Sequence, residues 1–391
     1  MAAIPDETIT IGTPSDLTVK IIEYEVKREF RTDPETNEDR VITERTPKKS
    51  ALIQVSRAKL IQNSEYFRRM LSSRWSGSDN TISLEEDTIK SMEVWFRLFH
   101  GNLSAMPCGS VSVPEMWHII MAADKYEFDR TRLESWFDDW FFTQQNKAMT
   151  KLSLNQQLLF PCHYFNCAWG FKILTKELVY KYPHHITEIN PTSHHQMHLP
   201  HRVIQQLNAA KGRLRTILQR GLFSQVSSIV NYAICDCKEK TVFNYLKEIQ
   251  NINVRPLDET LSRTSVQRNL DRLGQFNESN MRPKKDSNVI YKSVEEEWGE
   301  KPSAKDCMDC DRSWGEVVRR ARKETAEYFD GLCLDCMNTT KNIRLRGDED
   351  DDYWLHNEGR DRYDDGCRIS HGQPTWYFSF MGRREKRGQF V

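Results

Sequence analysis

Residues 51–71, ALIQVSRAKLIQNSEYFRRML, constrain the fold most, because their hydrophobic period changes midway. Apolar and polar residues alternate as far as Val55, which is typical of a half-buried strand, and the later apolar residues recur at helical spacing. Ser64 is suited to cap a second helix, since its hydroxyl can accept a hydrogen bond from a free N–H group at a helix start. The stretch therefore predicts a strand that runs into two helices, with Tyr66 and Phe67 in a core.

Several segments, in order along residues 14–145, resemble BTB/POZ domains. VSRAKLIQNSEYFRRML is similar to the family's strand, turn and Ser-x-x-Phe helix, although Ser56 stands where the family usually has histidine. Asp16 matches the aspartate that opens the family's first strand, and Asp16 and Arg57 could still form part of its charged pocket. The matching positions are Val55, Leu60, Ser64, Tyr66, Phe67 and Met70, followed by TISL at 81–84, VWFRLFHG at 94–101 and AADKY at 122–126.

The resemblance implies an α/β (α+β) BTB/POZ fold for residues 14–145 and binding of other proteins as its function. The commonest roles in that family are cullin ubiquitin-ligase adaptor and transcriptional cofactor. An adaptor would contact a cullin through the face built from residues 94–100 and 114–125. Many BTB domains dimerise through an extra N-terminal helix, and only 15 residues precede Asp16 here. The sequence is therefore compatible with a monomer as well as a homodimer.

The composition predicts a soluble protein of the cytoplasm or nucleus. Lys+Arg and Asp+Glu each number 56, so the net charge is zero and gives no global electrostatic basis for binding nucleic acid or an anionic membrane. The N-terminus, MAAIPDETIT, lacks the basic start and apolar core of a signal peptide. No apolar run approaches the roughly 20 residues that a membrane-spanning helix needs. In a reducing compartment the ten cysteines are expected to be free thiols or metal ligands.

The chain is expected to contain three parts. In the BTB-like part, residues 1–13 are interpreted as a frayed tail, and the charged residues 27–49 as a mobile hairpin or disordered loop. Residues 146–237 predict a helical extension, and residues 238–391 predict a Cys-rich lobe with a flexible connector near 275–303. The helices expected in the extension are 152–160, 167–180, 203–219 and 225–234, divided at Pro161, at Pro183, by the loop 191–200 and at Gly221.

Paired cysteines are the strongest chemical signal in the chain. The pairs are Cys235-x-Cys237, Cys307-x-x-Cys310, Cys333-x-x-Cys336 and Cys367-x-x-x-His371. Two residues between cysteines let both thiolates reach one ion from a tight turn, which is the building block of structural zinc sites. The four pairs supply enough ligands for about two tetrahedral sites, so we expect about two structural Zn²⁺ ions.

A predicted helix over residues 314–329 determines which pairs can share an ion. It would be roughly 22–24 Å long at 1.5 Å per residue, and it separates the second cysteine pair from the third. We therefore expect one site from Cys235, Cys237, Cys307 and Cys310, and another from Cys333, Cys336, Cys367 and His371. A single site that joins the Cys307 pair to the Cys333 pair is the alternative.

The segment after the last ligand supports a folded lobe. Residues 374–381, PTWYFSFM, form an aromatic strand-like run that is expected to pack over the metal. This run, with CRISHG before it and GLCLDCM at 331–337, resembles the C-terminal region of uncharacterised filamentous-fungal BTB-domain proteins. That resemblance implies no established activity.

No enzyme is expected, because the sequence contains no phosphate-loop, dinucleotide, nucleophile-elbow or zinc-protease motif. A closed four-ligand metal site leaves no position for a reacting water. A redox role for Cys-x-x-Cys would need a thioredoxin-like βαβ unit, which the pattern does not indicate. We interpret Cys162 and Cys167 as buried apolar cysteines. The histidines His184, His185, His194, His195, His198 and His201 are interpreted as a surface loop rather than a metal site.

The alternative function is a nuclear transcription cofactor with weak nucleic-acid contact through the zinc lobe. Its basis is the run Arg319, Arg320, Arg322 and Lys323, together with a basic cluster at 383–387. The acidic run 348–352 opposes this reading, and charge runs are usually solvated faces. Binding of other proteins is therefore the preferred function. A third hypothesis, a purely structural scaffold, predicts neither activity.

Overall fold

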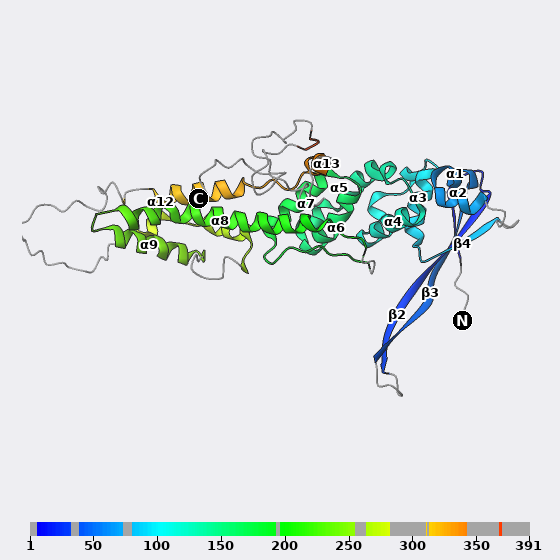
Figure 1. Ribbon diagram of the computed structural model, residues 1–391, viewed down its shortest axis with the longest axis horizontal. Coiled ribbons are helices and arrows are strands. Elements are labelled where there is room, and N and C mark those ends of the chain that lie inside the picture. Colours follow the sequence, from blue (N-terminus) through cyan, green and yellow to red (C-terminus); the bar gives the residue numbers. More distant parts are fainter. Residues whose placement is uncertain are drawn as a thin grey trace, which may run out of the picture. The chain divides into compact units, whose positions relative to one another are not determined.

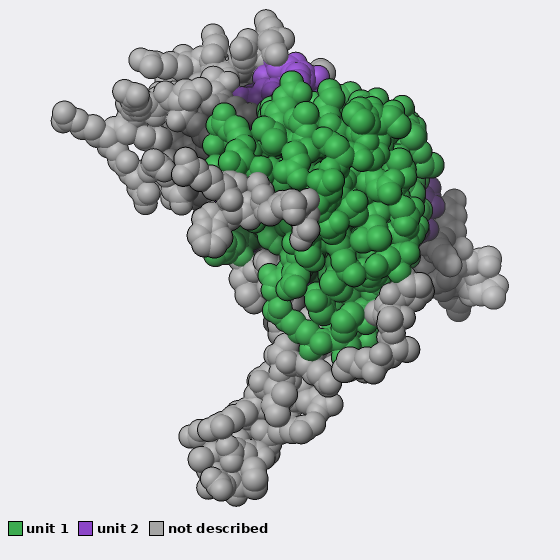
Figure 2. Space-filling model, turned by 90° about the vertical axis from the view of Figure 1, so that its right-hand side faces the viewer, with its two compact units in different colours: residues 1–170, 189–198 green, residues 171–188, 199–391 purple. Residues whose placement is uncertain are grey.

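The computed structural model describes residues 6–32, 39–72, 80–192, 196–254, 263–281, 310, 313–341 and 367–369. The chain forms two compact units (Figures 1 and 2). Unit 1 comprises Met1–Gly170 and Ile189–His198, and unit 2 comprises Phe171–Glu188 and Leu199–Val391. The expected domain limits at residues 145 and 237 stay a prediction.

Unit 1 contains one mixed sheet, in agreement with the expected α/β class. Its strands are β1 (Glu7–Thr10), β2 (Leu17–Thr32), β3 (Asp39–Val55) and β4 (Thr81–Glu85), in the order β1-β3-β2-β4. β2 and β3 are antiparallel, whereas β1 is parallel to β3 and β4 is parallel to β2. The frayed tail expected over residues 1–13 is wrong for β1, because its backbone pairs with residues 51–54.

The β2–β3 hairpin continues past its neighbours in the sheet as a two-stranded ribbon (Figure 1). β4 accompanies β2 only to Ile22, and β1 accompanies β3 only over residues 51–54. The pairing of β2 with β3 runs on to Thr32 opposite Asp39, with a register shift between Glu23 and Tyr24. Of the two alternatives for residues 27–49, the hairpin is therefore observed for the strands, while residues 33–38 lie outside the described part.

The strand that runs into two helices is confirmed as β3, α1 (Arg57–Asn63) and α2 (Glu65–Ser72). The Ser64 hydroxyl accepts a hydrogen bond from the Phe67 N–H at 3.1 Å and donates one to the Tyr126 carbonyl at 2.7 Å. Phe67 is fully buried, but Tyr66 is 37% exposed, so its predicted place in the core is wrong. Consecutive helical residues point about 100° apart, and here Phe67 faces the core while Tyr66 lies at its edge against the Tyr126 ring.

The remaining helices of unit 1 pack on one another, and the first of them also contacts the sheet. Phe137, Trp140 and Phe141 on α5 are buried. Cys162 and Cys167 are also buried, which confirms their interpretation as core residues. The elements are α3 (Ile89–Phe99), α4 (Val113–Tyr126), α5 (Glu134–Thr150) and α6 (Leu152–Tyr164), with the short 3-10 helices η1 (Leu103–Ala105), η2 (Cys108–Ser110) and η3 (Arg130–Leu133).

The predicted division of the helical region at Pro161 is wrong, because α6 continues through this proline to Tyr164. Proline lacks the N–H group that would bond to the carbonyl four residues earlier in a helix. That carbonyl belongs to Gln157, and it accepts a hydrogen bond from the Trp117 indole nitrogen at 2.9 Å. A tertiary contact thus satisfies the acceptor that the proline leaves free.

Unit 2 is helical in the part of the chain that the structure describes. The greater part of α7 (Ala168–Lys181) belongs to it, and its longest helix is α8 (His201–Tyr232). Shorter helices follow, and α12 packs along α8. They are α9 (Lys238–Asn251), α11 (Val266–Leu273), η4 (Glu278–Met281), α12 (Trp314–Ala326) and α13 (Leu334–Lys341).

The helix break predicted at Gly221 is wrong, because α8 is continuous through this residue. A Cβ atom at this position would lie only 2.6 Å from the Cβ of Ala321 on α12. The glycine therefore permits close approach of two helices, which is a common structural use of this residue. The helix predicted over residues 314–329 is present as α12, and Trp314, Val318 and Ala321 are buried on one face of it.

Within the described residues, none of the helices combines the length and apolar character needed to cross a bilayer. The longest, α8, has 32 residues and carries Lys211, Arg213 and Arg215 in its middle.

Candidate metal centre

The described residues of unit 2 bring six cysteines together in two groups of three. The first cysteine group is Cys235, Cys237 and Cys310, and the second cysteine group is Cys333, Cys336 and Cys367. Within each group all sulfur atoms lie within 4.8 Å of one another, so each group could hold a metal ion. Cys307 and His371, the expected fourth ligands, lie outside the described residues.

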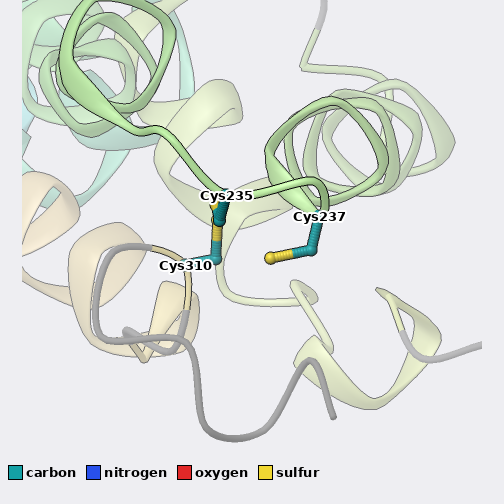
Figure 3. Close-up of side chains that lie close together, drawn as sticks. All are labelled: Cys235, Cys237 and Cys310. Atoms are coloured by element: carbon teal, nitrogen blue, oxygen red, sulfur yellow. The ribbon is translucent and has the colours of Figure 1, made fainter. Parts of the chain in front are cut away.

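The first cysteine group joins the α8–α9 connection to the segment before α12 (Figure 3). Cys235 and Cys237 follow the end of α8, and the Cys237 carbonyl accepts the Thr241 N–H at 3.0 Å as α9 begins. The sulfur atoms of Cys235 and Cys310 are 3.3 Å apart. Cys310 is buried, whereas Cys235 and Cys237 are half-exposed.

The second cysteine group is built on the start of α13. The Cys333 carbonyl accepts the Met337 N–H at 3.1 Å, so the first helical turn brings Cys333 and Cys336 to the same side. The third member, Cys367, lies with its sulfur 3.6 Å from that of Cys336. Cys333 and Cys336 are buried and Cys367 is half-exposed.

Hydroxyl groups of α7 hold the connection between α12 and the second cysteine group. Thr175 Oγ1 accepts the Leu332 N–H at 2.9 Å. The Tyr180 hydroxyl accepts the Phe329 N–H at 3.2 Å and donates to the Thr325 carbonyl at 2.9 Å. Neither α7 residue can be singled out from the sequence, because nothing local indicates that a distant backbone segment will need these partners.

Gly331 fixes the path of the same connection. Its φ of +103° is unfavourable for residues with a side chain, and a Cβ atom there would lie 2.1 Å from the Lys172 carbonyl oxygen. Residue 331 must therefore be glycine for the backbone to lie against α7. This contact fixes the chain two residues before Cys333.

Burial and neighbouring sulfur atoms raise the pKa of thiols in both groups. Burial, followed by the hydrogen bond with Cys235, raises the pKa of the Cys310 thiol. The hydrogen bond with Cys333, followed by burial, raises the pKa of Cys336. Burial and the charge of Cys333 raise the pKa of Cys367 to about 11. Three adjacent thiolates repel one another, so these groups ionise together only when a cation neutralises them.

The donor chemistry indicates what kind of cation would fit. Thiolates are soft ligands that select zinc, copper(I) and iron–sulfur centres over magnesium or calcium. Cys310 belongs to one group and the Cys333–Cys336 pair to the other, so the described residues do not form the alternative single site. The exposed histidines His184, His185 and His198 belong to neither group.

Comparison with known proteins gives no relative: no family model, no curated protein and no solved structure matches the chain. The class of protein is therefore defined by the structure alone. The protein is a mixed α/β chain with two groups of three cysteines that could each hold a metal ion.

Proposed function

We propose that this chain is a protein-interaction module of the BTB/POZ class whose C-terminal part is held together by two structural zinc ions. The observation that carries the interaction proposal is the contact between two sequence landmarks, Ser64 and Tyr126. A second observation supports the proposal. The Asp16 carboxylate accepts a hydrogen bond from the Arg57 N–H at 2.6 Å, which joins the start of β2 to the start of α1. The proposed function suits a protein of the cytoplasm or nucleus and includes no catalytic step.

The partner surface is proposed on α4 with the end of α3, as expected for a cullin adaptor. Most of residues 94–99 are buried, and the accessible positions among them are Arg97 and Leu98, which are half-buried. On α4, Pro114, His118, Met121 and Lys125 recur at helical spacing and are exposed or half-exposed. This stripe combines apolar and charged groups at the periphery of the core, as protein-binding surfaces do.

Affinity capture with a surface variant tests the adaptor proposal. The tagged chain and its Met121→Glu variant are incubated with cell extract at moderate and at high salt, and mass spectrometry identifies bound proteins. We expect a cullin to bind the wild type at both salt concentrations and to be lost from Met121→Glu. Asp138→Lys, at an exposed position on α5, is the matched control and keeps the partner. Absence of a cullin from the wild type, or its retention by Met121→Glu, contradicts the adaptor role.

Zinc is proposed as the metal because groups of three neighbouring cysteine thiolates match structural zinc sites. Binding at such sites contributes on the order of 10 kcal/mol to folding in small metal-dependent domains. Cys307 is proposed to complete the first site and His371 the second. Both sites then have four ligands and leave no coordination position for substrate.

Alkylation of the cysteines tests metal binding at the first cysteine group. Cys108 is half-exposed like Cys235 and Cys237, but it belongs to neither cysteine group, so it is an internal control. We expect Cys108 to react with iodoacetamide at all times, and Cys235 and Cys237 to react only after chelation. Equal labelling of the three cysteines in zinc-loaded protein contradicts the first site.

The second candidate function is a nuclear cofactor with nucleic-acid contact through α12. The observation that favours it is the exposure of Arg319, Arg320, Arg322 and Lys323 on the side of α12 opposite its buried face. Phosphate contacts of this kind make binding strongly salt-dependent. Charge reversal of the four residues would abolish salt-sensitive DNA or RNA binding, and unchanged binding would contradict this candidate.

A further inference from the structure

A pair of charged residues, Asp335 and Arg368, lies beside the second cysteine group. Asp335 lies between Cys333 and Cys336, and Arg368 directly follows Cys367. Asp335 Oδ1 accepts hydrogen bonds from Arg368 Nε at 2.9 Å and from its Nη2 at 2.7 Å. Asp335 Oδ2 accepts the backbone N–H of Arg368 at 2.8 Å. One carboxylate thus binds both the side chain and the main chain of the residue beside the third cysteine.

We propose that Asp335 and Arg368 are positioning residues of the second metal site, which hold Cys367 in place before the ion binds. This inference rests on the proposed metal binding at that site. The backbone hydrogen bond fixes the main chain next to Cys367, and the two guanidinium hydrogen bonds to Oδ1 hold the Arg368 side chain against the same carboxylate. The three hydrogen bonds between these residues form the Asp335–Arg368 clamp.

The clamp matters because Cys367 comes from a distant part of the chain. Cys333 and Cys336 are brought together by one turn of helix, whereas Cys336 and Cys367 are 31 residues apart. Closing such a loop costs conformational entropy, which metal binding would otherwise have to offset alone. A clamp that already holds the third ligand lowers this cost and therefore raises the affinity for the ion.

The charges of the clamp are arranged to suit a thiolate site. A carboxylate beside three sulfur atoms would by itself disfavour their ionisation, because like charges repel. Arg368 lies against that carboxylate and neutralises it. Exposed ion pairs contribute little to global stability, and here the Arg368 and Asp335 side chains are 46% and 23% exposed. The expected effect is therefore on metal affinity rather than on the fold as a whole.

The first cysteine group supplies a matched control. Asp236 lies between Cys235 and Cys237, as Asp335 lies between Cys333 and Cys336. Its side chain is exposed, and no role in positioning Cys310 is proposed for it. Replacing each aspartate by asparagine removes the same charge from equivalent sequence positions in the two groups.

Chelator competition on the full-length, zinc-loaded protein tests the clamp. Zinc release is followed with a metal-sensitive dye, and Cys336→Ser identifies the release step that belongs to the second site. We expect Asp335→Asn and Arg368→Lys each to weaken the second site by about tenfold or more, as loss of an outer-shell partner does elsewhere. Release from the first site stays unchanged, and Asp236→Asn leaves both steps as in the wild type.

Three outcomes overturn the inference, and they differ in what else they affect. If the wild type binds zinc at both sites and Asp335→Asn releases it identically, the clamp is only a surface ion pair. If Asp335→Asn weakens both sites equally, its effect is on the general fold. If the wild type binds no metal at all, the proposed zinc sites fail together with the clamp. Far-ultraviolet circular dichroism of each variant verifies that it is folded.

Discussion

The sulfur atoms of Cys235 and Cys310 lie 3.3 Å apart although 75 residues separate them in the chain. Their proximity depends on the packing of α12 against α8, because Cys235 follows one helix and Cys310 precedes the other. Gly221 and Ala321 permit that packing, because a Cβ atom at residue 221 would lie 2.6 Å from the Cβ of Ala321. The packing of α12 on α8 and the first cysteine group should therefore stabilise each other.

Two glycines in α8 provide a direct test of this helix contact. Gly221→Ala would bring a Cβ to 2.6 Å from Ala321 Cβ, and overpacking of this kind costs about 1–3 kcal/mol of unfolding free energy. Gly212→Ala meets no atom within 4 Å and should stabilise the helix by about 0.5–1 kcal/mol. Urea unfolding of both variants measures the effect. Stabilisation by Gly221→Ala would contradict the packing.

A double-mutant cycle tests the contact between Trp117 and the Gln157 carbonyl. Trp117→Phe removes the hydrogen bond and some buried volume, and the unsatisfied carbonyl contributes about 1–3 kcal/mol of the loss. Pro161→Ala supplies a backbone N–H that can satisfy the same carbonyl. Trp117→Phe should therefore cost about 1 kcal/mol less in the Pro161→Ala background than in the wild type. Strictly additive unfolding free energies for the four proteins would show that the two groups do not share the acceptor.

Gly221 and Pro161 show the limit of prediction from the sequence alone. The period change before and after Val55 and the apolar face of α12 are local signals, and the strand and helices they predicted are present. Gly221 and Pro161 are also local signals, yet a distant partner decides their structural effect. Ala321 requires a glycine inside a continuous helix, and Trp117 compensates for a proline inside another.

The cysteine groups show the same limit. Helical spacing alone brings Cys333 and Cys336 to one side of a turn. The positions of Cys310 and Cys367 depend on long-range packing. The sequence constrained them only through the length of the helix predicted over residues 314–329, which keeps Cys310 apart from Cys333. Asp335 and Arg368 gave no signal in the sequence, because an acidic residue inside a Cys-x-x-Cys pair is unremarkable without the contact it makes.

Thr175→Val tests the anchoring of the second cysteine group to α7. The replacement keeps the shape of the side chain but leaves the buried Leu332 N–H without its acceptor, so we expect a loss of about 1–3 kcal/mol. Zinc should also leave the second site faster, because Leu332 precedes Cys333. Thr216→Val is the control, since the Thr216 hydroxyl is exposed and bonds within its own helix. Equal effects of both variants would contradict a special role for Thr175.

The stability of the metal-free protein should fall at alkaline pH. Burial raises the pKa of Cys367 from 9.0 to about 11, so the folded state holds this proton more tightly than the unfolded state. The resulting stabilisation is fully present below pH 9 and is lost as the pH rises through about 11. Urea unfolding across this interval measures the loss, which should be absent in zinc-loaded protein and smaller in Cys367→Ser. A metal-free stability that rises over the same interval would contradict the burial of this thiol.

Native mass spectrometry of the intact chain, purified without chelator, tests the central claim most directly. We predict two zinc ions per folded chain, one ion in Cys336→Ser and one ion in Cys235→Ser, because each variant disables a different site. A wild-type chain that carries one ion or none would contradict the account of two separate structural zinc sites.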